Sequence, residues 1–241
     1  MQTEIPAALS TSELFARVHA LSPRIAVFDC DGTLWSGDAG SSFMWWSMEN
    51  GLLTSDRTAW LKNRYEEYRR GEISEIVICG EMVQVYHAIE VETLRRAAAD
   101  FFRDHVERHI FPEMAALIAD LQRDGVDIWA VSSTNDWVID EGVKRFNIPA
   151  NRVLAARVES IAGVATNRLL DVPTDEGKVT ALARAGITAP DAVFGNSIHD
   201  AAMLAIARGA FPVNPSPGLV ERAAIEGWRV YYPASVASPS A

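Results

Sequence analysis

The chain has 241 residues, of which 49% are hydrophobic, and its formal net charge is -10. This composition supports a buried core in one large or two smaller domains and excludes a chain that is disordered throughout. The acidic balance argues against nucleic acid or an anionic membrane as a partner, because either needs a basic face. A small phosphorylated molecule remains compatible if the site supplies its own cation.

The cysteine content and the N-terminal region bear on the cellular compartment. Cys30 and Cys79 are the only cysteines, which excludes a disulfide framework and a zinc cluster and fits a reducing compartment. The first 21 residues carry Glu4 and Glu13 and lack the basic start and long apolar stretch of a signal peptide. We therefore expect a cytoplasmic protein. Residues 234–241 are predicted to form a flexible tail, and the oligomeric state is open.

The first predicted elements are a helix over Glu13–Ala20, with Ser12 as its cap, and a strand over Ile25–Phe28. The apolar run of Ile25–Phe28 is too short for a helix and suits a parallel strand that is buried on both faces. The carboxyl end of such a strand is where open α/β sheets bind their ligands.

Two aspartates follow this strand directly. Asp29 and Asp31 are one residue apart, so both can point into the crevice at the end of the strand. Two carboxylates this close suit a hard cation and a division of labour between a nucleophile and a general acid or base. Gly32 permits a sharp turn, which Thr33 can hydrogen-bond. Alone, however, this stretch is more typical of a turn with solvated aspartates.

Residues 36–109 follow a different pattern. A small, flexible stretch over residues 36–42 precedes the aromatic run Phe43-Met-Trp-Trp46, and no strands alternate with the helices that come next. The pattern predicts an all-helical cap domain over residues 36–109, placed above the carboxyl end of the first strand. Its expected helices are Ser55–Arg70, Ser74–Ile89 and Val91–His109.

From Pro112 onward helices and strands alternate, as a doubly wound sheet requires. We predict an α/β fold in which residues 1–35 and 110–233 form a Rossmann-like, doubly wound parallel sheet core. Residues 163–166 form either a hairpin or an irregular loop. The predicted strands are Val126–Val131, Arg152–Val158, Asp191–Phe194, Phe211–Val213 and Trp228–Tyr232. The predicted helices are Pro112–Asp124, Asn135–Phe146, Asp175–Ala185, His199–Arg208 and Ser216–Glu226.

Polar groups recur at later strand ends and helix starts. Ser132 and Ser133 follow a strand and suit an anionic oxygen, or else only cap the next helix. Lys178 lies early in a helix, where the dipole disfavours a cation; it either faces clustered negative charge or is a solvated surface lysine. Asn196 and Asp200 carry oxygen ligands of the kind that Mg²⁺ prefers.

The order of these pieces resembles the haloacid dehalogenase superfamily of hydrolases. Asp29-Cys-Asp-Gly-Thr33 is similar to its first motif, Ser132 to its second, Lys178 to its third and Gly195-Asn-Ser-Ile-His-Asp200 to its fourth. The resemblance covers residues 24–232, and the helical insert looks like the cap of the phosphoserine phosphatase-like branch.

This resemblance implies a Mg²⁺-dependent phosphatase that hydrolyses a small-molecule phosphomonoester through an aspartyl-phosphate intermediate. Asp29 would attack phosphorus, and Asp31 would protonate the leaving alcohol and then activate water. Ser132 and Lys178 would hold the phosphoryl group. The implied metal ligands are Asp29, Asp31, Asn196 and Asp200. The implied substrate-binding residues are Gly32, Thr33, Ser132, Ser133, Lys178, Asp38 and Trp45.

Two departures from the family pattern leave questions open. Asn196 stands where many members have Asp, so either Asn196 or Asp200 is the main metal ligand of the fourth motif. His199 stands where several phosphatases have Asn, and a histidine on a helix surface is the favoured interpretation.

The residues that select the substrate are also open. Trp45 and Trp46 either line the entrance or pack the cap. The unranked candidates for binding a substrate carboxylate are Arg57, Arg64, Arg69 and Arg70. The alternative functions are a phosphotransferase or phosphomutase on the same fold, and a non-catalytic binding protein.

Overall fold

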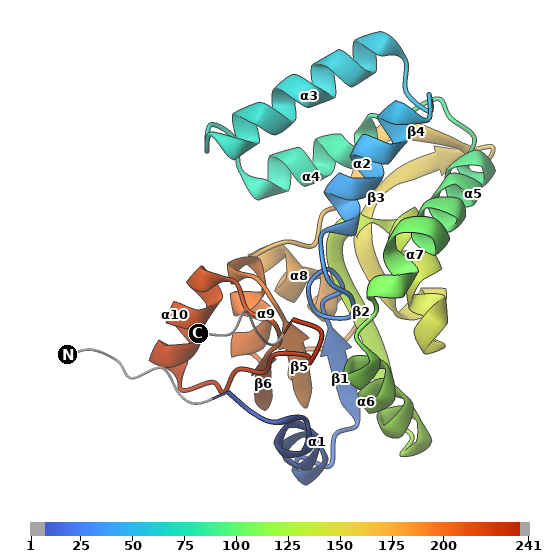
Figure 1. Ribbon diagram of the computed structural model, residues 1–241. Helices are drawn as coiled ribbons and strands as arrows, with labels where there is room; N and C mark the ends of the chain where they lie inside the picture. The colour runs from blue at the N-terminus through green and yellow to red at the C-terminus, as the bar shows by residue number, and fades with distance from the viewer. Residues whose placement is uncertain (1–7, 237–241) are drawn as a thin grey trace.

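A six-stranded sheet lies between two layers of helices in the computed structural model, which describes residues 8–236 (Figure 1). The strand order is β4-β3-β2-β1-β5-β6, and only the pair β3 and β4 is antiparallel. The predicted α/β, Rossmann-like fold is thereby confirmed. The strands are β1 (Ile25–Phe28), β2 (Asp127–Asn135), β3 (Val153–Ile161), β4 (Val164–Asp171), β5 (Ala192–Gly195) and β6 (Gly209–Pro212).

Alternate residues of β1 enter two different hydrophobic cores. Val27 packs in the core that includes Leu182 and Leu204, whereas Ala26 and Phe28 belong to the core on the opposite face. Burial on both faces confirms the expectation for this strand, and each such apolar side chain contributes roughly 1.5–3 kcal/mol. The first core involves α8 (Glu176–Arg184), α9 (Ala201–Ala205) and α10 (Pro217–Glu226), and the second involves α1 (Thr11–Ala20), α6 (Pro112–Arg123) and α7 (Asp136–Val143).

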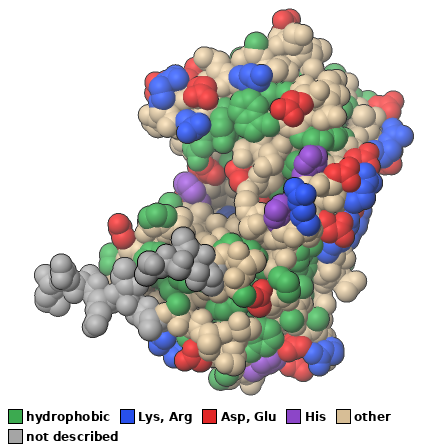
Figure 2. All heavy atoms as spheres, viewed as in Figure 1, with side chains coloured by type: hydrophobic (Ala, Val, Ile, Leu, Met, Phe, Trp, Pro, Cys, Tyr) green, Lys and Arg blue, Asp and Glu red, His purple; other side chains and the backbone are tan. Residues whose placement is uncertain are grey.

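Of the five α-helices that connect β1 to β2, the first four form an insert that lies at the carboxyl ends of the parallel strands (Figure 1). They are α2 (Ala39–Glu49), α3 (Ser55–Arg69), α4 (Glu75–Gln84) and α5 (Val91–Phe101), and α5 is followed by a π-helical turn and a 3-10 turn that reach His109. The helical nature of this insert is confirmed, while the exact domain boundaries stay a prediction. Figure 2 shows the surface hollowed between α3 and α4 above and the sheet domain below.

Helix α2 was not expected from the sequence. It begins at Ala39, inside the stretch predicted to be flexible, because Asp38 caps it by accepting the backbone N–H of Ser41 at 2.9 Å. Similarly, α1 begins at Thr11 with Ser10 as its cap instead of Ser12, because Ser10 and Glu13 form a capping box.

In the later part of the chain, one open alternative is resolved and one predicted strand does not form. The open question at residues 163–166 is answered by a hairpin of β3 and β4, whose turn holds Ala162 and Gly163 at positive φ. The predicted strand over Trp228–Tyr232 is wrong, since Tyr231 forms only isolated bridges to Leu9 and Val213.

Residues 237–241 of the predicted flexible tail lie outside the described residues. At the start of this tail, the backbone N–H of Ala234 donates a hydrogen bond to Glu113 Oε1 at 2.8 Å. Within residues 8–236, no helix combines the length and apolar character needed to cross a bilayer.

Candidate active site

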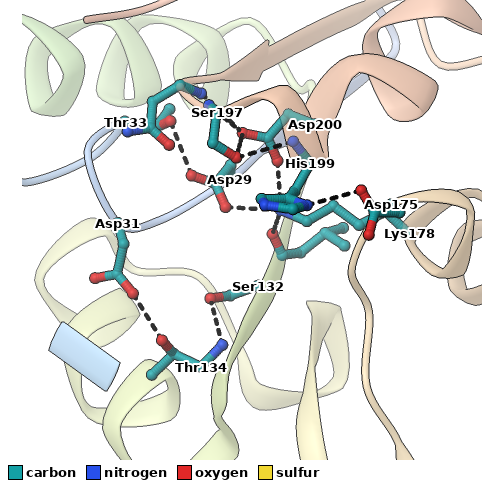
Figure 3. Close-up of polar contacts among 12 residues, drawn as sticks. Asp29, Asp31, Thr33, Ser132, Thr134, Asp175, Lys178, Ser197, His199 and Asp200 are labelled. Carbon is teal, nitrogen blue, oxygen red and sulfur yellow. Dashed lines mark hydrogen bonds and ion pairs between the residues drawn. The ribbon is translucent and has the colours of Figure 1, made fainter. Parts of the chain in front are cut away.

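Asp29 lies at the carboxyl end of β1, where its backbone N–H still pairs with Phe194 of β5 at 2.9 Å. Its side chain is only 6% exposed, so its charge needs nearby compensation. Lys178 Nζ donates to one carboxylate oxygen at 2.7 Å and Thr33 Oγ1 donates to the other at 3.0 Å (Figure 3). The first motif therefore supplies a buried carboxylate together with one of its own hydrogen-bond donors.

Lys178 projects from the first turn of α8 into the interior and is 2% exposed. Its ammonium donates to Asp29 Oδ1 at 2.7 Å, to Asp200 Oδ1 at 2.5 Å and to the carbonyl of Val131 at 3.1 Å. Burial lowers the pKa of Lys178, but the attraction of Asp200 and Asp29 outweighs it and raises that pKa above its usual range. The alternative of a solvated surface lysine is wrong.

Asp200 is fully buried beneath the site. Its Oδ2 accepts the backbone N–H groups of Asn196 at 2.8 Å and Ser197 at 2.9 Å, while Oδ1 faces Lys178. Asn196 borders the cavity and Asp200 does not. Of the two candidate metal ligands in the fourth motif, the geometry therefore favours Asn196.

Asp31 is held by three donors from different segments. Trp35 Nε1 and the backbone N–H of Ala39 donate to Oδ1 at 2.6 Å and 2.8 Å, and Thr134 Oγ1 donates to Oδ2 at 2.7 Å. Burial, with the charge of Asp38, raises the pKa of Asp31 to about 6 despite these hydrogen bonds. A carboxyl group with such a pKa is suited to exchanging protons near neutral pH.

Burial also raises the pKa of Asp29, to about 7, with the neighbouring charge of Asp200 as the second cause. Lys178 opposes this shift by its charge and by its hydrogen bond. The two aspartates thus lie in a site with several carboxylates, where the Lys178 ammonium is the compensating positive charge.

Gly32 is required where the first and fourth motifs meet. Its φ is +73°, and a Cβ at this position would lie 1.8 Å from Asn196 Nδ2. A larger residue would therefore push Asn196 away, besides straining the backbone. Ser132 is 1% exposed and its Oγ accepts the backbone N–H of Thr134 at 3.1 Å, and Ser132 and Ser133 both border the cavity.

The cavity above these groups has a volume of about 260 Å³. It brings together Asp29, Asp31, Asp38, Ser132, Ser133, Lys178 and Asn196, all of them residues singled out from the sequence. The sequence analysis missed its helical wall, because nothing in the pattern shows which faces of α3 and α4 turn toward the sheet. That wall is formed by Tyr65, Tyr68, Glu75, Ile78, Cys79 and Met82.

Other predicted residues lie elsewhere. Trp45 packs edge-on against Tyr65 with ring centroids 5.7 Å apart and borders a neighbouring cavity, so it is not brought to the aspartates. None of the four arginine candidates borders the active-site cavity. His199 lies at a helix surface with a side chain that is 33% exposed, and it also borders the cavity, with its Nδ1 2.8 Å from Asp175 Oδ1.

The donor set fits a hard divalent cation. Asp29, Asp31 and Asn196 all border the cavity and carry oxygen ligands, and Mg²⁺ accepts few protein ligands and keeps several waters. Across residues 8–236 there is no group of three or more His, Cys, Asp or Glu side chains arranged to hold a metal. A cation here would therefore depend on amide, backbone and water oxygens besides carboxylates.

Comparisons with known proteins agree with this architecture. A histidinol-phosphatase of Neisseria meningitidis serogroup C is 24% identical over 217 residues, which are 86% of this chain and 97% of the relative. A Bordetella pertussis protein of unknown function superposes with a TM-score of 0.74 at 24% identity, covering 87% and 98% of the two chains. A phosphoserine phosphatase solved as a phospho-aspartyl intermediate analogue superposes with a TM-score of 0.58 at 15% identity, covering 87% and 93%.

The family model of haloacid dehalogenase-like hydrolases matches residues 26–205. This range runs from the strand before Asp29 to the helix after Asp200 and includes all four motifs. The chain therefore belongs to the haloacid dehalogenase-like hydrolases.

Proposed function

We propose that the protein is a Mg²⁺-dependent phosphatase that hydrolyses a small phosphomonoester through an acyl phosphate on Asp29, an aspartyl-phosphate intermediate. The observation that carries this proposal is the setting of Asp29, which borders a cavity while Lys178 and Thr33 fix its two oxygens. A carboxylate fixed in this way is oriented to attack a phosphorus atom placed in the cavity.

In the first step, Asp29 forms a bond to phosphorus while the bond from phosphorus to the leaving oxygen breaks. Asp31, held by Thr134 and Ala39, donates a proton to that oxygen. In the second step, Asp31 takes a proton from water, which attacks phosphorus and releases Asp29. Ser132 and the backbone at Ser133 bind the phosphoryl oxygens.

Asp29, the backbone carbonyl of Asp31 and Asn196 would hold the cation. A Mg²⁺ ion bound there supplies neutralisation of the phosphoryl charge. Asn196 brings one negative charge fewer than a carboxylate, so we expect metal binding to be weaker in this chain than in a site with Asp at this position.

Hydrolysis of p-nitrophenyl phosphate, with and without MgCl₂, tests the proposal. We expect Mg²⁺-dependent release of phosphate that Asp29→Asn abolishes, and a covalent phosphate on the peptide that contains Asp29 after acid quenching. Asp104→Asn, on an exposed side chain outside the cavity, is the matched control and should keep full activity. Turnover that survives Asp29→Asn would contradict the mechanism.

The same first step would serve a phosphotransferase. Adding an alcohol acceptor and analysing the products separates the two, since a phosphatase makes inorganic phosphate even when the acceptor is abundant. L-Histidinol phosphate belongs in the substrate panel because the relative from Neisseria meningitidis carries the name histidinol-phosphatase.

A further inference from the structure

The helical wall of the active-site cavity is acidic and aromatic. Glu75, near the start of α4, borders the cavity with a side chain that is 16% exposed. The hydroxyl of Tyr68 donates to its Oε2, and the ring of Tyr65 lies beside that of Tyr68 with centroids 6.1 Å apart. The leaving group of a phosphomonoester would project toward this wall, because the phosphoryl group occupies the end at Asp29.

No lysine or arginine balances Glu75 within the described lining of the cavity. Lys178 is the only residue of either type there, and its ammonium already donates to two carboxylates and one carbonyl. The donors to Glu75 are the neutral Tyr68 hydroxyl and the Cys79 thiol at 3.5 Å. His199 Nε2 lies 3.8 Å from Glu75, but the ring is bound more closely to Asp175.

No arginine of the helical insert borders the cavity, and two of them bind other groups. Arg57 donates to the carbonyls of Val85 and His87, and Arg64 donates to Glu81. The cavity therefore offers a substrate carboxylate no available cation. A substrate cation, in contrast, would meet the partly buried carboxylate of Glu75. Binding such a cation would offset the free-energy cost of removing this carboxylate from water.

From this arrangement we propose that the site selects phosphomonoesters whose leaving alcohol carries a protonated amine, and that Glu75 is the specificity-determining residue. The ammonium binds the Glu75 carboxylate, and the aromatic rings of Tyr65 and Tyr68, which border the same cavity, favour a cation. This inference rests on the proposed phosphatase function, since it assigns the leaving-group end of the same cavity.

Three phosphate esters of nearly equal size test the proposal: 2-aminoethyl phosphate, propyl phosphate and carboxymethyl phosphate. We expect kcat/KM to fall in that order. Glu75→Gln should lower kcat/KM for 2-aminoethyl phosphate by about tenfold or more, mainly through KM, while leaving propyl phosphate nearly unchanged. The same variant should raise the rate with carboxymethyl phosphate, because one repulsive charge is removed.

Glu81→Gln is the matched control, because Glu81 lies on the same helix but binds Arg64 and does not border the cavity. It should preserve the order of the three esters. Equal kcat/KM for the three esters, or an equal effect of Glu75→Gln on all of them, would overturn the assignment.

The two proposals fail in different ways. Loss of the charge preference with intact turnover of p-nitrophenyl phosphate contradicts only the assignment of Glu75. Absence of all turnover contradicts the proposed function, and calorimetric titration of the wild type with the three esters then decides the charge preference. Tighter binding of 2-aminoethyl phosphate supports the assignment, and equal binding overturns it.

Discussion

Lys178 connects the nucleophile to the fold. Its ammonium lies between Asp29 and Asp200, both of which are buried, and the backbone carbonyl of Val131 accepts its third hydrogen bond. Replacing one member of such a group leaves an uncompensated buried charge, which costs more than the lost pair contributes. The lysine is therefore expected to matter for stability as well as for orienting Asp29.

We predict that Lys178→Met lowers the free energy of unfolding by about 3–5 kcal/mol, because Asp29 and Asp200 lose their compensating charge. The double variant Lys178→Met/Asp200→Asn should recover part of this loss, since only one carboxylate then remains unpaired. Urea denaturation at pH 7.5 measures both effects. Lys62→Met, at an exposed position on α3, is the control and should change little. A Lys178→Met variant as stable as the wild type would refute the argument.

At the scale of elements, α2 is the part of the helical insert that contacts the first motif. The backbone N–H of Ala39 in its first turn donates to Asp31, and the next residue, Gly40, lies against Thr134. A Cβ on Gly40 would be 2.5 Å from Thr134 Oγ1, the atom that donates to Asp31. The position of α2 therefore determines how the carboxyl group of Asp31 is oriented.

Gly40→Ala should thus impair catalysis even though alanine favours helices by about 1 kcal/mol over glycine. We expect kcat to fall by on the order of tenfold or more, because the displaced Thr134 hydroxyl no longer orients Asp31. Thr134→Ala should show a similar loss. Since the smaller side chain makes room for the new methyl group, Gly40→Ala/Thr134→Ala should be no worse than Thr134→Ala alone. Additive losses in kcat would speak against this contact.

The same helix shows where sequence patterns fail. Residues 36–42 combine Gly, Ser and Asp, which have low intrinsic helix propensity, so a flexible stretch was expected there. In the structure, α2 is stabilised by its cap and by burial of Phe43 and Met44 against the insert. The cap is a local contact, but Phe43 packs against Tyr86 and Phe101, which are far away in the sequence, and local propensity does not contain such packing.

For the whole molecule, the sheet and its motifs were more predictable than the insert. The strand before Asp29 and the polar groups after later strands follow from burial and from the shared edge of a parallel sheet. Glu75 and Tyr68 instead reach the cavity through the packing of helices across the site, and the spacing of apolar residues along α3 gives no clear face. The end of the cavity at Asp29 was therefore predictable from the sequence, and the helical wall with Glu75 and Tyr68 was not.

The final prediction concerns global stability and pH, and it depends on Asp136 at the start of α7. Burial, with the charge of Asp140, raises the pKa of Asp136 to about 7, although Arg157 and Arg95 oppose this shift. Its Oδ1 is buried without a hydrogen-bond partner among the described residues.

Because the folded state holds the proton of Asp136 more tightly than the unfolded state does, the fold is favoured at low pH. Its stability falls as the pH rises from about 4 to 7, by at most roughly 4 kcal/mol from this group. Asp136→Asn cannot ionise, so urea denaturation at pH 8 should show it to be more stable than the wild type, and the difference should shrink toward pH 4. Asp120→Asn, a more exposed carboxylate near the end of α6, should not change this slope. Parallel pH profiles of Asp136→Asn and the wild type would show that Asp136 is not the group responsible.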